Sequence, residues 1–396
     1  MKIAIICPYY VPQTTSCAVQ IRDLAKELVT LGHEAIVLTP SQNFTEGGQV
    51  DVIDGVTVYR LAALKIENTN LFRRTIAEVL MPLTMTLSLH RARLSAKSFE
   101  GVIWYSPSIF LGPIAWYLKF RSKSKGYLIL RDIFPEWALD LDIIKKGPTY
   151  YFFKLVAAFQ YSVADTIGVQ SDSNLGYLST WVRPFRRIEV LSNWLAPSRN
   201  IVETSSFDLS QLAGRKLFVY IGNMGIAQGM EILVRLAESL KDRSDLGFVF
   251  VGRGSEKKKL IRLSKSLGLD NVLFHDEILP EDIRALLGCC DVGLLALDPR
   301  HNSHNIPGKF LAYVESGLPV LARLNAETDL SKILLERKIG AFYSGESIKE
   351  FSDIALSLIE NDSELADMSS RCVALYTSEY LPSKAARQVL SCFEKE

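Results

Sequence analysis

The sequence predicts an α/β protein built from two doubly wound parallel sheets, and three observations carry this prediction. Short, unbroken apolar runs recur along the chain, and segments with helical periodicity lie between them. This alternation is interrupted once, near the middle of the chain. Residues 3–6 form the first apolar run, which is typical of a parallel strand buried on both faces. Residues 19–31 then carry leucines at helical spacing, and 35–39 form the next strand. A strand, a helix and a strand within forty residues open a doubly wound sheet.

The remaining elements follow the same pattern on either side of an irregular segment. In the first half, we expect further strands at 102–105, 127–130, 166–169 and 188–191. In the second half, we expect strands at 217–221, 248–251, 272–275, 292–297 and 319–322, with helices at 230–240, 256–267, 281–287 and 310–316. Residues between them are rich in Ser, Pro and Asn, which indicates a linker. The predicted domains are residues 1–196, a linker at 197–213, residues 214–375, and a helical segment 376–396 that returns to the first domain.

Charge and cysteine content exclude several classes of protein. The 396 residues carry 45 basic and 44 acidic side chains, so the chain as a whole does not have the charge of a nucleic-acid binder. Residues 1–196 hold 21 basic against 16 acidic residues, whereas residues 197–396 hold 24 against 28. This asymmetry predicts different partners for the two domains. Six cysteines without a C-x-x-C pair, and no cleavable leader pattern, predict a cytoplasmic protein with reduced thiols.

Two glycine-rich turns follow predicted strands of the second domain. Gly222, Gly225 and Gly229 follow the strand at 217–221, and Gly252-Arg253-Gly254 follows the strand at 248–251. Glycine lets the backbone approach a phosphate, and a helix start supplies N–H donors to it. The spacing matches neither G-x-G-x-x-G nor a Walker loop, which disfavours an NAD-dependent oxidoreductase. A tight turn without a ligand is the structural alternative.

A third motif, Pro307-Gly308-Lys309-Phe310, precedes a predicted helix. A cation at a helix start opposes the helix dipole, although a solvated lysine would be tolerated there. An anion bound at this helix start explains Lys309 better. Since open α/β sheets bind ligands at the carboxyl ends of their strands, we expect the site in a cleft between the two domains.

These motifs occur in a familiar order. The matching segments are Ile221–Gly225, Val251–Gly254, Asn271–Phe274, Asp291-Val292, Pro307–Lys309 and Gly317–Val320. Together they resemble the donor half of retaining glycosyltransferases of family 4, which have the GT-B fold. The first half is similar to the same family through its opening strand–helix–strand unit and Leu130-Arg131-Asp132-x-x-Pro135-Glu136-Trp137.

The resemblance implies the transfer of a sugar from a nucleotide diphosphate sugar to a hydroxyl, without a metal or a cofactor. The expected donor is a UDP-linked amino or deoxy hexose, and the expected acceptor is a lipid-linked saccharide of bacterial O-antigen or capsule assembly. The resemblance assigns donor binding to Thr15, Ser16, Gly222, Asn223, Met224, Gly225, Gln228, Arg253, Pro307, Gly308, Lys309, Phe310 and Glu315. It places the nucleotide base near residues 274–278.

The chain departs from the family pattern at the diphosphate. Many relatives carry an Arg and a Lys where Asn223 and Gln228 stand, and the family's pair of glutamates falls on His304 and Ala312. Glu315, one helical turn further on, could replace the second glutamate or could be an ordinary solvated helix residue. Lys309 and Arg253, with Arg300 or His304, must then neutralise the diphosphate.

Asp132 is the first candidate for the general base and Glu136 the second, because the strand at 127–130 ends beside them. The alternative for Glu136 is a helix-start residue after Pro135. In retaining transfer the leaving phosphate can itself take the proton, so a protein base is not required. The pair Asp140 and Asp142 lies in the other domain from the phosphate turns, and we expect no metal there.

Residues 71–89 mix apolar side chains with arginines. This pattern fits a peripheral contact with an anionic membrane and equally a core helix with a solvated basic face. The uncharged segment 101–118 is interrupted by Pro and Gly, which favours a strand, a loop and a buried helix over a membrane span. Two other functions stay open, a nucleotide-sugar 2-epimerase and a non-catalytic partner protein that binds a nucleotide sugar.

Overall fold

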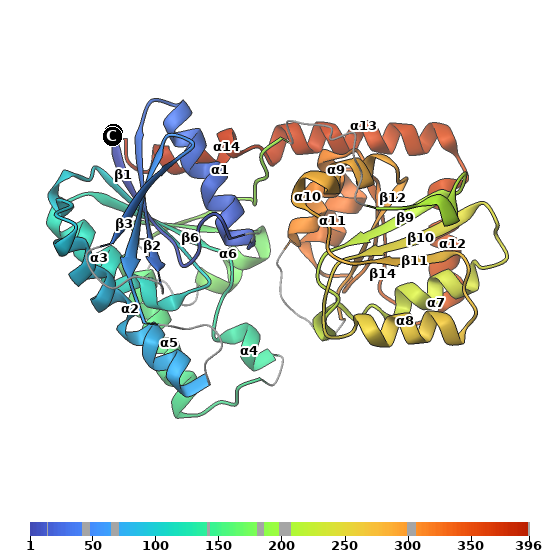
Figure 1. The fold of residues 1–396 in the computed structure, drawn as a ribbon, viewed down its shortest axis with the longest axis horizontal. Coiled ribbons are helices and arrows are strands. Elements are labelled where there is room, and N and C mark those ends of the chain that lie inside the picture. Colours follow the sequence, from blue (N-terminus) through green and yellow to red (C-terminus); the bar gives the residue numbers. More distant parts are fainter. Residues whose placement is uncertain are drawn as a thin grey trace. The chain divides into compact units, whose positions relative to one another are not determined.

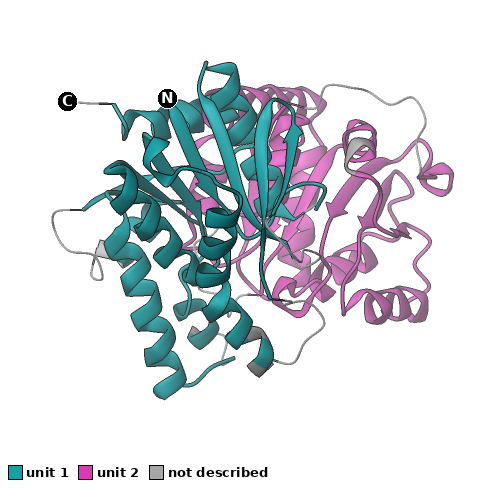
Figure 2. Ribbon diagram, turned by 60° about the vertical axis from the view of Figure 1, so that its left-hand side comes forward, with its two compact units in different colours: residues 1–195, 381–396 teal, residues 196–380 magenta. Residues whose placement is uncertain are grey.

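The computed structural model describes residues 1–13, 15–41, 48–64, 71–140, 143–179, 186–197, 207–298 and 306–394. The chain forms two compact units, shown in Figure 2. Unit 1 comprises Met1–Leu195 and Leu381–Glu396, and unit 2 comprises Ala196–Tyr380. Each unit has its own sheet, so the expected α/β class with two largely parallel sheets is confirmed.

Unit 1 contains an eight-stranded sheet in the order β3-β4-β2-β1-β5-β6-β7-β8 (Figure 1). Its strands are β1 (Lys2–Ile6), β2 (Glu34–Ser41), β3 (Gln49–Ile53), β4 (Val56–Ala62), β5 (Gly101–Tyr105), β6 (Lys125–Leu130), β7 (Thr166–Val169) and β8 (Arg187–Val190). All neighbours pair in parallel except β3 and β4. Strands β1 and β5 are almost entirely buried, as their unbroken apolar sequences predict.

The β3–β4 hairpin at the edge of this sheet was not predicted. Strand β3 is exposed or half-buried throughout, and β4 mixes buried with half-buried residues, so neither strand contains an unbroken buried apolar run. A signal was nevertheless present, because Asp54-Gly55 joins the strands and both residues have positive φ, at 52° and 79°. Asp-Gly is a preferred two-residue hairpin turn.

Helices cover both faces of the sheet in unit 1. They are α1 (Ser16–Thr30), α2 (Leu71–Arg91), α3 (Gly112–Ser122), α4 (Glu136–Asp140), α5 (Pro148–Val163), α6 (Asp172–Ser179) and α14 (Pro382–Ser391). Helices α2, α3, α5 and α6 pack in one apolar core, and α1 and α14 pack in the other. The segment 101–118 forms β5, a short 3₁₀ turn and α3, as expected.

Although α14 is the last helix of the chain, it packs beside α1. The Gln388 Nε2 donates hydrogen bonds to the Val190 carbonyl at 2.7 Å and to Glu189 Oε1 at 2.9 Å, which join α14 to β8. The preceding helix α13 (Asp362–Glu379) belongs to unit 2. The chain therefore passes from unit 2 back to unit 1 directly before Pro382.

Unit 2 contains a six-stranded parallel sheet in the order β11-β10-β9-β12-β13-β14. Its strands are β9 (Lys216–Ile221), β10 (Leu246–Val251), β11 (Val272–His275), β12 (Val292–Ala296), β13 (Val320–Arg323) and β14 (Gly340–Tyr343). Its other helices are α7 (Glu231–Ser239), α8 (Lys257–Ser266), α9 (Pro280–Gly288), α10 (Gly308–Glu315), α11 (Asp329–Glu336) and α12 (Ile348–Ile359). The strand order reverses between β9 and β12, and such a switch point is where doubly wound sheets bind ligands.

The last residues of the predicted linker, residues 197–213, are part of unit 2. Ser210–Leu212 form a 3₁₀ turn, and the Leu212 side chain is buried against Gly247 of β10. Its final residues therefore belong to the core of unit 2. Within the described ranges of the chain, no helix is both long and apolar enough to cross a membrane.

Candidate functional site

The glycine turns of unit 2 lie at the switch point of its sheet. Gly222 directly follows β9, and the Asp298 amide, just beyond β12, donates a hydrogen bond to the Ala227 carbonyl at 2.9 Å. This bond links the segments that leave the two strands. The structure therefore places the Gly222–Gly225 turn where the sheet opens, as its position after a strand predicted.

The turns after β9 and β10 pack on each other through their backbones. The Gly222 amide donates to the Val251 carbonyl at 2.8 Å, and Met224 donates to the Arg253 carbonyl at 2.7 Å. A Cβ on Gly252, whose φ is +143°, would lie 2.0 Å from the Gly222 carbonyl oxygen. No side chain fits in that space. Gly252 is thus required for the shape of the turn before any ligand binds.

Asn223, Gly225 and Gln228 form one hydrogen-bonded unit in this turn. Gln228 Oε1 accepts from the Gly225 amide at 2.9 Å and from Asn223 Nδ2 at 3.2 Å. The side-chain oxygen of Gln228 therefore stabilises the turn at a position where many relatives carry a cation. Because the Gly225 amide already has a partner, it is not available to a phosphate in this arrangement.

The assignment of Met224 as a donor contact needs a correction. Its side chain is fully buried in the core of unit 2, its amide donates to Arg253, and its carbonyl accepts from the Glu256 amide at 3.0 Å. Met224 therefore supports the turn from below and presents no side-chain atom at its surface.

Lys309 lies beneath the Gly222 turn, which the sequence could not show. Its Nζ donates a hydrogen bond to the Tyr220 hydroxyl and lies 3.8 Å from the centre of the Tyr220 ring. The Tyr220 hydroxyl in turn donates to the Asn223 carbonyl at 2.6 Å. An atom added at the Cβ position of Gly222 would stand 3.9 Å from the Lys309 Nζ.

The environment of this ammonium group favours its neutral form. Among the described residues, no carboxylate lies within 4 Å of Lys309, and burial lowers its pKa to about 7. A cation held in a poorly hydrated place without a counter-ion gains most when an anion arrives. The three motifs that follow β9, follow β10 and begin α10 are thus brought together, with a lysine beneath the first of them.

In the predicted Pro307–Phe310 motif, Pro307 lies before α10 and the other three residues begin the helix. Pro307 precedes the helix in an extended conformation, and open space surrounds the exposed Gly308. The Phe310 amide donates to the Pro307 carbonyl at 3.0 Å, and the Phe310 ring packs edge-on against Tyr380 in the core. Phe310, one of the predicted donor-binding residues, therefore offers neither a free amide nor an exposed ring, because it is buried on the inner face of the helix.

Glu315 and Arg253 are both engaged in ion pairs. The Glu315 side chain is only 6% exposed, and its Oε1 lies 3.5 Å from Arg284 of α9. The alternative of a solvated helix residue is therefore wrong for Glu315. Arg253 is exposed, and its Nε lies 3.3 Å from Glu277 Oε2, within the 274–278 segment expected near the base. Arg300 and His304 lie outside the described residues.

In unit 1, Thr15 and Ser16 lie at the start of α1. The Thr15 Oγ1 accepts a hydrogen bond from the Ala18 amide at 3.3 Å, so this side chain caps the helix. Ser16 is exposed beside it. The two residues occupy the loop after β1, at the point where the sheet order of unit 1 reverses.

Arg131 and Asp132 follow β6, as predicted. The buried Arg131 guanidinium donates to the Leu191 carbonyl at 2.6 Å and lies 5.0 Å from the centre of the Trp194 ring. Burial lowers the pKa of Arg131, and the neighbouring Asp132 opposes that shift. Asp132 is half-buried, and its carbonyl accepts from Ser106 Oγ at 3.3 Å. Arg131 therefore joins the ends of β6 and β8 and adds a positive charge beside Asp132.

Glu136 belongs to a network that the sequence analysis missed. Its Oε1 accepts from the Tyr150 hydroxyl at 2.9 Å and lies 3.6 Å from Lys154 Nζ, which donates to the same hydroxyl at 3.2 Å. Its Oε2 is buried and has no hydrogen-bond partner among the described residues. Burial raises the pKa of Glu136, while Tyr150 and Lys154 oppose this shift.

Glu136 is the first residue of α4, which agrees with the helix-start alternative, yet its side chain is buried rather than solvated. A sequence signal existed for its partners, since Tyr150 and Lys154 are four residues apart and share one face of α5. Asp142 and the Asp140 side chain lie outside the described residues. In the part of the chain that the structure describes, no three His, Cys, Asp or Glu side chains are grouped to hold a metal ion.

Comparison with known proteins relates this geometry to a family. Residues 215–361 match the family described as glycosyl transferases group 1. The chain is similar to a probable glycosyltransferase, WbjE of Pseudomonas aeruginosa, with 23% identity over 228 residues that cover 56% of this chain and 57% of WbjE. It is also similar to a putative colanic acid biosynthesis glycosyl transferase, WcaI of Escherichia coli K12. In that case the identity is 23% over 354 residues, covering 84% of this chain and 86% of WcaI.

The fold has counterparts among solved structures. Sucrose-phosphate synthase from Thermosynechococcus elongatus superimposes with a TM-score of 0.75 at 14% identity, covering 99% of this chain and 98% of the other. HepE of Anabaena, solved in complex with UDP and glucose, gives a TM-score of 0.68 at 14% identity with the same coverage. At this identity the likeness shows the fold alone. These findings show that the chain has the GT-B fold and that residues 215–361 of unit 2 match the group 1 glycosyl transferase family.

Proposed function

We propose that this chain is a retaining, metal-independent glycosyltransferase that takes its sugar from a UDP-linked amino or deoxy hexose and needs no cofactor. The proposed acceptor is a hydroxyl of a lipid-linked saccharide in bacterial surface polysaccharide assembly. The relatives WbjE and WcaI support the transferase assignment, and the name of WcaI refers to colanic acid, a polysaccharide. The UDP bound to HepE supports the choice of nucleotide.

The observation that carries the proposal is the Lys309 ammonium beneath the Gly222 turn, at the switch point of unit 2. A diphosphate bound at this turn would meet the first turn of α10 and a lysine that has no counter-ion among the described residues. Asn223, Gln228 and Arg253 would line the same anion site, and Glu315 would hold the ribose only by exchanging its contact with Arg284. Thr15 and Ser16 of unit 1 are proposed donor contacts on the family resemblance alone.

The acceptor side of the proposal rests on the loop that follows β6. Asp132 is the proposed base for the acceptor hydroxyl, with Glu136 as the second candidate, and the leaving phosphate is the other group that can receive the proton. Lys309 stabilises the charge that develops on the departing diphosphate. Because the acceptor is lipid-linked, we place the enzyme at the inner face of the plasma membrane.

The proposal is tested by a thermal-shift panel of UDP, GDP, TDP and ADP, followed by turnover with the sugar of the nucleotide that binds. We expect UDP alone to raise Tm, by roughly 5 °C or more at a hundredfold excess over its Kd. We also expect transfer to extracted lipid-linked saccharides with retention at the anomeric carbon. No shift with any nucleotide would contradict the donor site.

The same assays separate the two alternatives. A 2-epimerase would change the sugar of the donor when no acceptor is present. A non-catalytic partner protein would show the UDP-dependent shift but no turnover on any lipid-linked acceptor.

A further inference from the structure

We infer that unit 1 binds an anionic bilayer through the outer face of α3 and α5, and that α5 links this surface to the loop of the catalytic candidates. The inference deepens the proposed function, since it rests on a lipid-linked acceptor. We name this surface the α3–α5 face and define it by six exposed side chains, Trp116, Phe120, Tyr151, Phe152, Leu155 and Phe159.

Helix α5 is apolar on both of its sides. Tyr150, Ala157 and Tyr161 are buried toward the sheet. On the opposite side, Tyr151, Leu155 and Phe159 are exposed and spaced four residues apart, so they form one stripe along the helix. The Leu155 side chain is 71% exposed. A helix that is apolar all round is normally covered on both sides.

Helix α3 continues this stripe. A Cβ on Gly112 would lie 3.0 Å from the Gln160 Cα and 3.3 Å from the Phe159 ring, so the two helices touch at this glycine. Trp116 is one turn further along α3, and its ring stacks on that of Phe120 with centres 5.5 Å apart and planes at 15°. Phe120 is 67% exposed. Exposed aromatic side chains thus lie on both of these neighbouring helices.

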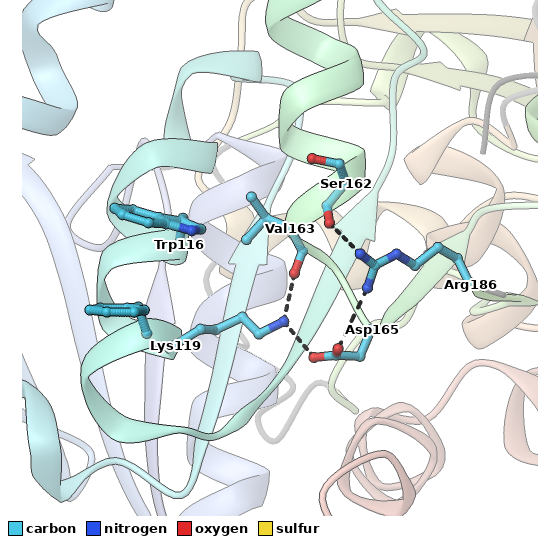
Figure 3. Close-up of a pocket in the computed structure, with 7 residues that line it drawn as sticks. Trp116, Lys119, Ser162, Val163, Asp165 and Arg186 are labelled. Carbon is cyan, nitrogen blue, oxygen red and sulfur yellow. Dashed lines mark hydrogen bonds and ion pairs between the residues drawn. The ribbon is translucent and has the colours of Figure 1, made fainter. Parts of the chain in front are cut away.

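A groove at the junction of the two helices shows how they are held together (Figure 3). It has a volume of about 340 Å³ and lies beside Trp116. Lys119 donates to the Val163 carbonyl at 2.6 Å and pairs with Asp165. Arg186 donates to the Ser162 carbonyl at 2.7 Å and lies 3.6 Å from Asp165 Oδ1. Lys119 and Arg186 therefore bond to the carbonyl groups at the end of α5 and to Asp165, and these contacts fix the end of α5 beside α3.

The charges around the face favour an anionic partner. Helices α3 and α5 contain no acidic residue, and exposed cations flank them at Arg121, Lys123, Lys145 and Lys146. Among the described residues, no carboxylate lies within 4 Å of any of these four. Apolar and aromatic side chains bordered by lysine and arginine suit the interface of an anionic bilayer. A second copy of this face would bring like charges together, which disfavours a dimer.

The inner side of α5 contacts the loop that carries the catalytic candidates. The Phe153 ring lies 5.0 Å from the Phe134 ring, and Tyr150 donates to Glu136. One helix therefore presents its outer stripe to the bilayer and its inner side to the 131–136 loop. This arrangement keeps that loop about one helix diameter, roughly 10 Å, from the surface where a lipid-linked saccharide emerges.

Helix α2 also packs beside α3. It buries Met81 and Met85 and exposes Leu83 and Leu87. Helix α2 therefore has a core face, as the core-helix alternative of the sequence analysis expects, and it also exposes apolar side chains. The membrane contact of residues 71–89 stays a proposal. The larger aromatic surface on α3 and α5 was missed because neither helix shows a separate polar stripe.

The test is co-sedimentation of the full chain with vesicles of equal parts phosphatidylglycerol and phosphatidylcholine. We expect the double variant Phe120→Glu/Leu155→Glu to lose at least about tenfold in vesicle affinity. The double variant Lys145→Gln/Lys146→Gln should lose about fivefold in affinity for these anionic vesicles for each cation removed. Leu335→Glu on α11 of unit 2, where Leu335 is 58% exposed, is the matched control and should bind as the wild type does.

Each variant is first checked for an unchanged Tm and an unchanged UDP-dependent shift. Vesicle binding by Phe120→Glu/Leu155→Glu equal to that of the wild type would overturn the inference. A wild-type dimer that this variant converts to monomers, without vesicle binding by either, would also overturn it in favour of a second copy. Absence of a UDP shift in the wild type would instead count against the proposed function, so the two failures are distinguishable.

Discussion

The two units share a doubly wound design, but backbone contacts shape the candidate site of unit 2, whereas side-chain contacts shape that of unit 1. In unit 2 the turns of the site are shaped by backbone, because those after β9 and β10 pack together through glycines and carbonyl groups, with the Lys309 side chain beneath them. In unit 1 it is made of side chains, since Glu136 depends on Tyr150 and Lys154 of another helix. A backbone site allows few substitutions, whereas a side-chain site can change its chemistry with single residues. This difference agrees with the proposed function, in which unit 2 binds a constant diphosphate and unit 1 binds a variable acceptor.

The largest effect is expected from adding a methyl group where the turns after β9 and β10 pack together, which tests whether backbone contacts shape the site of unit 2. Gly252→Ala would place Cβ 2.0 Å from the Gly222 carbonyl oxygen in a left-handed conformation. We expect a loss of about 3 kcal/mol or more in the free energy of unfolding, because strain and overpacking add. Urea denaturation measures this loss. Gly288→Ala is the control, since open space surrounds Gly288, and it should change stability by less than about 0.5 kcal/mol. Equal stability of the two variants would refute the interlocked turn.

A second change separates ligand binding from folding in the same unit. Lys309→Met removes the cation beneath the Gly222 turn while keeping most of its volume. We expect UDP affinity to fall about a hundredfold, as when one partner of a buried charged contact is lost. Stability should stay equal or rise, because a poorly hydrated charge has been removed. Titration calorimetry and urea denaturation measure the two effects, and unchanged UDP affinity would contradict the anion site.

The titration of Lys309 sharpens this test. Since its pKa is lowered to about 7 in the folded protein, Lys309 is mostly neutral at pH 8, and a bound diphosphate should restore its proton. Calorimetry in two buffers of different ionisation enthalpy should show proton uptake on UDP binding, and Lys309→Met should abolish it. The unfolded chain binds this proton up to about pH 10.4, so the contribution of Lys309 to stability should rise between pH 7 and that value.

The smallest expected effect concerns the side-chain site. Tyr150→Phe removes a hydrogen bond that lowers the pKa of Glu136, so that pKa should rise further. If the Glu136 carboxylate takes part as a base, the acidic limb of the kcat/KM profile moves to higher pH. Loss of the hydrogen bond should also lower the free energy of unfolding by about 1 kcal/mol. Tyr151→Phe, on the outer side of α5, serves as control and should leave the profile in place. An unmoved limb in Tyr150→Phe would leave Asp132 or the leaving phosphate as the proton acceptor.

The comparison also shows which parts of the site could be predicted from the sequence. Gly222 and Gly252 were predicted because backbone requirements produce local motifs directly after strands, and Lys309 because it follows Pro307-Gly308 at a helix start. Tyr150 and Lys154 were not found, since nothing in an apolar helix indicates which carboxylate it will face. The edge hairpin β3–β4 was missed for a different reason, because the search followed apolar runs rather than the Asp54-Gly55 turn.

The sequence by itself determined the two parallel sheets and the positions of the phosphate-type turns. Both follow from short-range rules, since burial on two faces demands continuous apolar strands and tight turns demand glycine. Only the tertiary structure decided that Lys309 lies under Tyr220 and Gly222, that Phe310 points inward, and that Glu315 meets Arg284. The physical reason is that these contacts join residues tens of positions apart. Their partners are chosen by the packing of whole helices against a sheet, which no local pattern records.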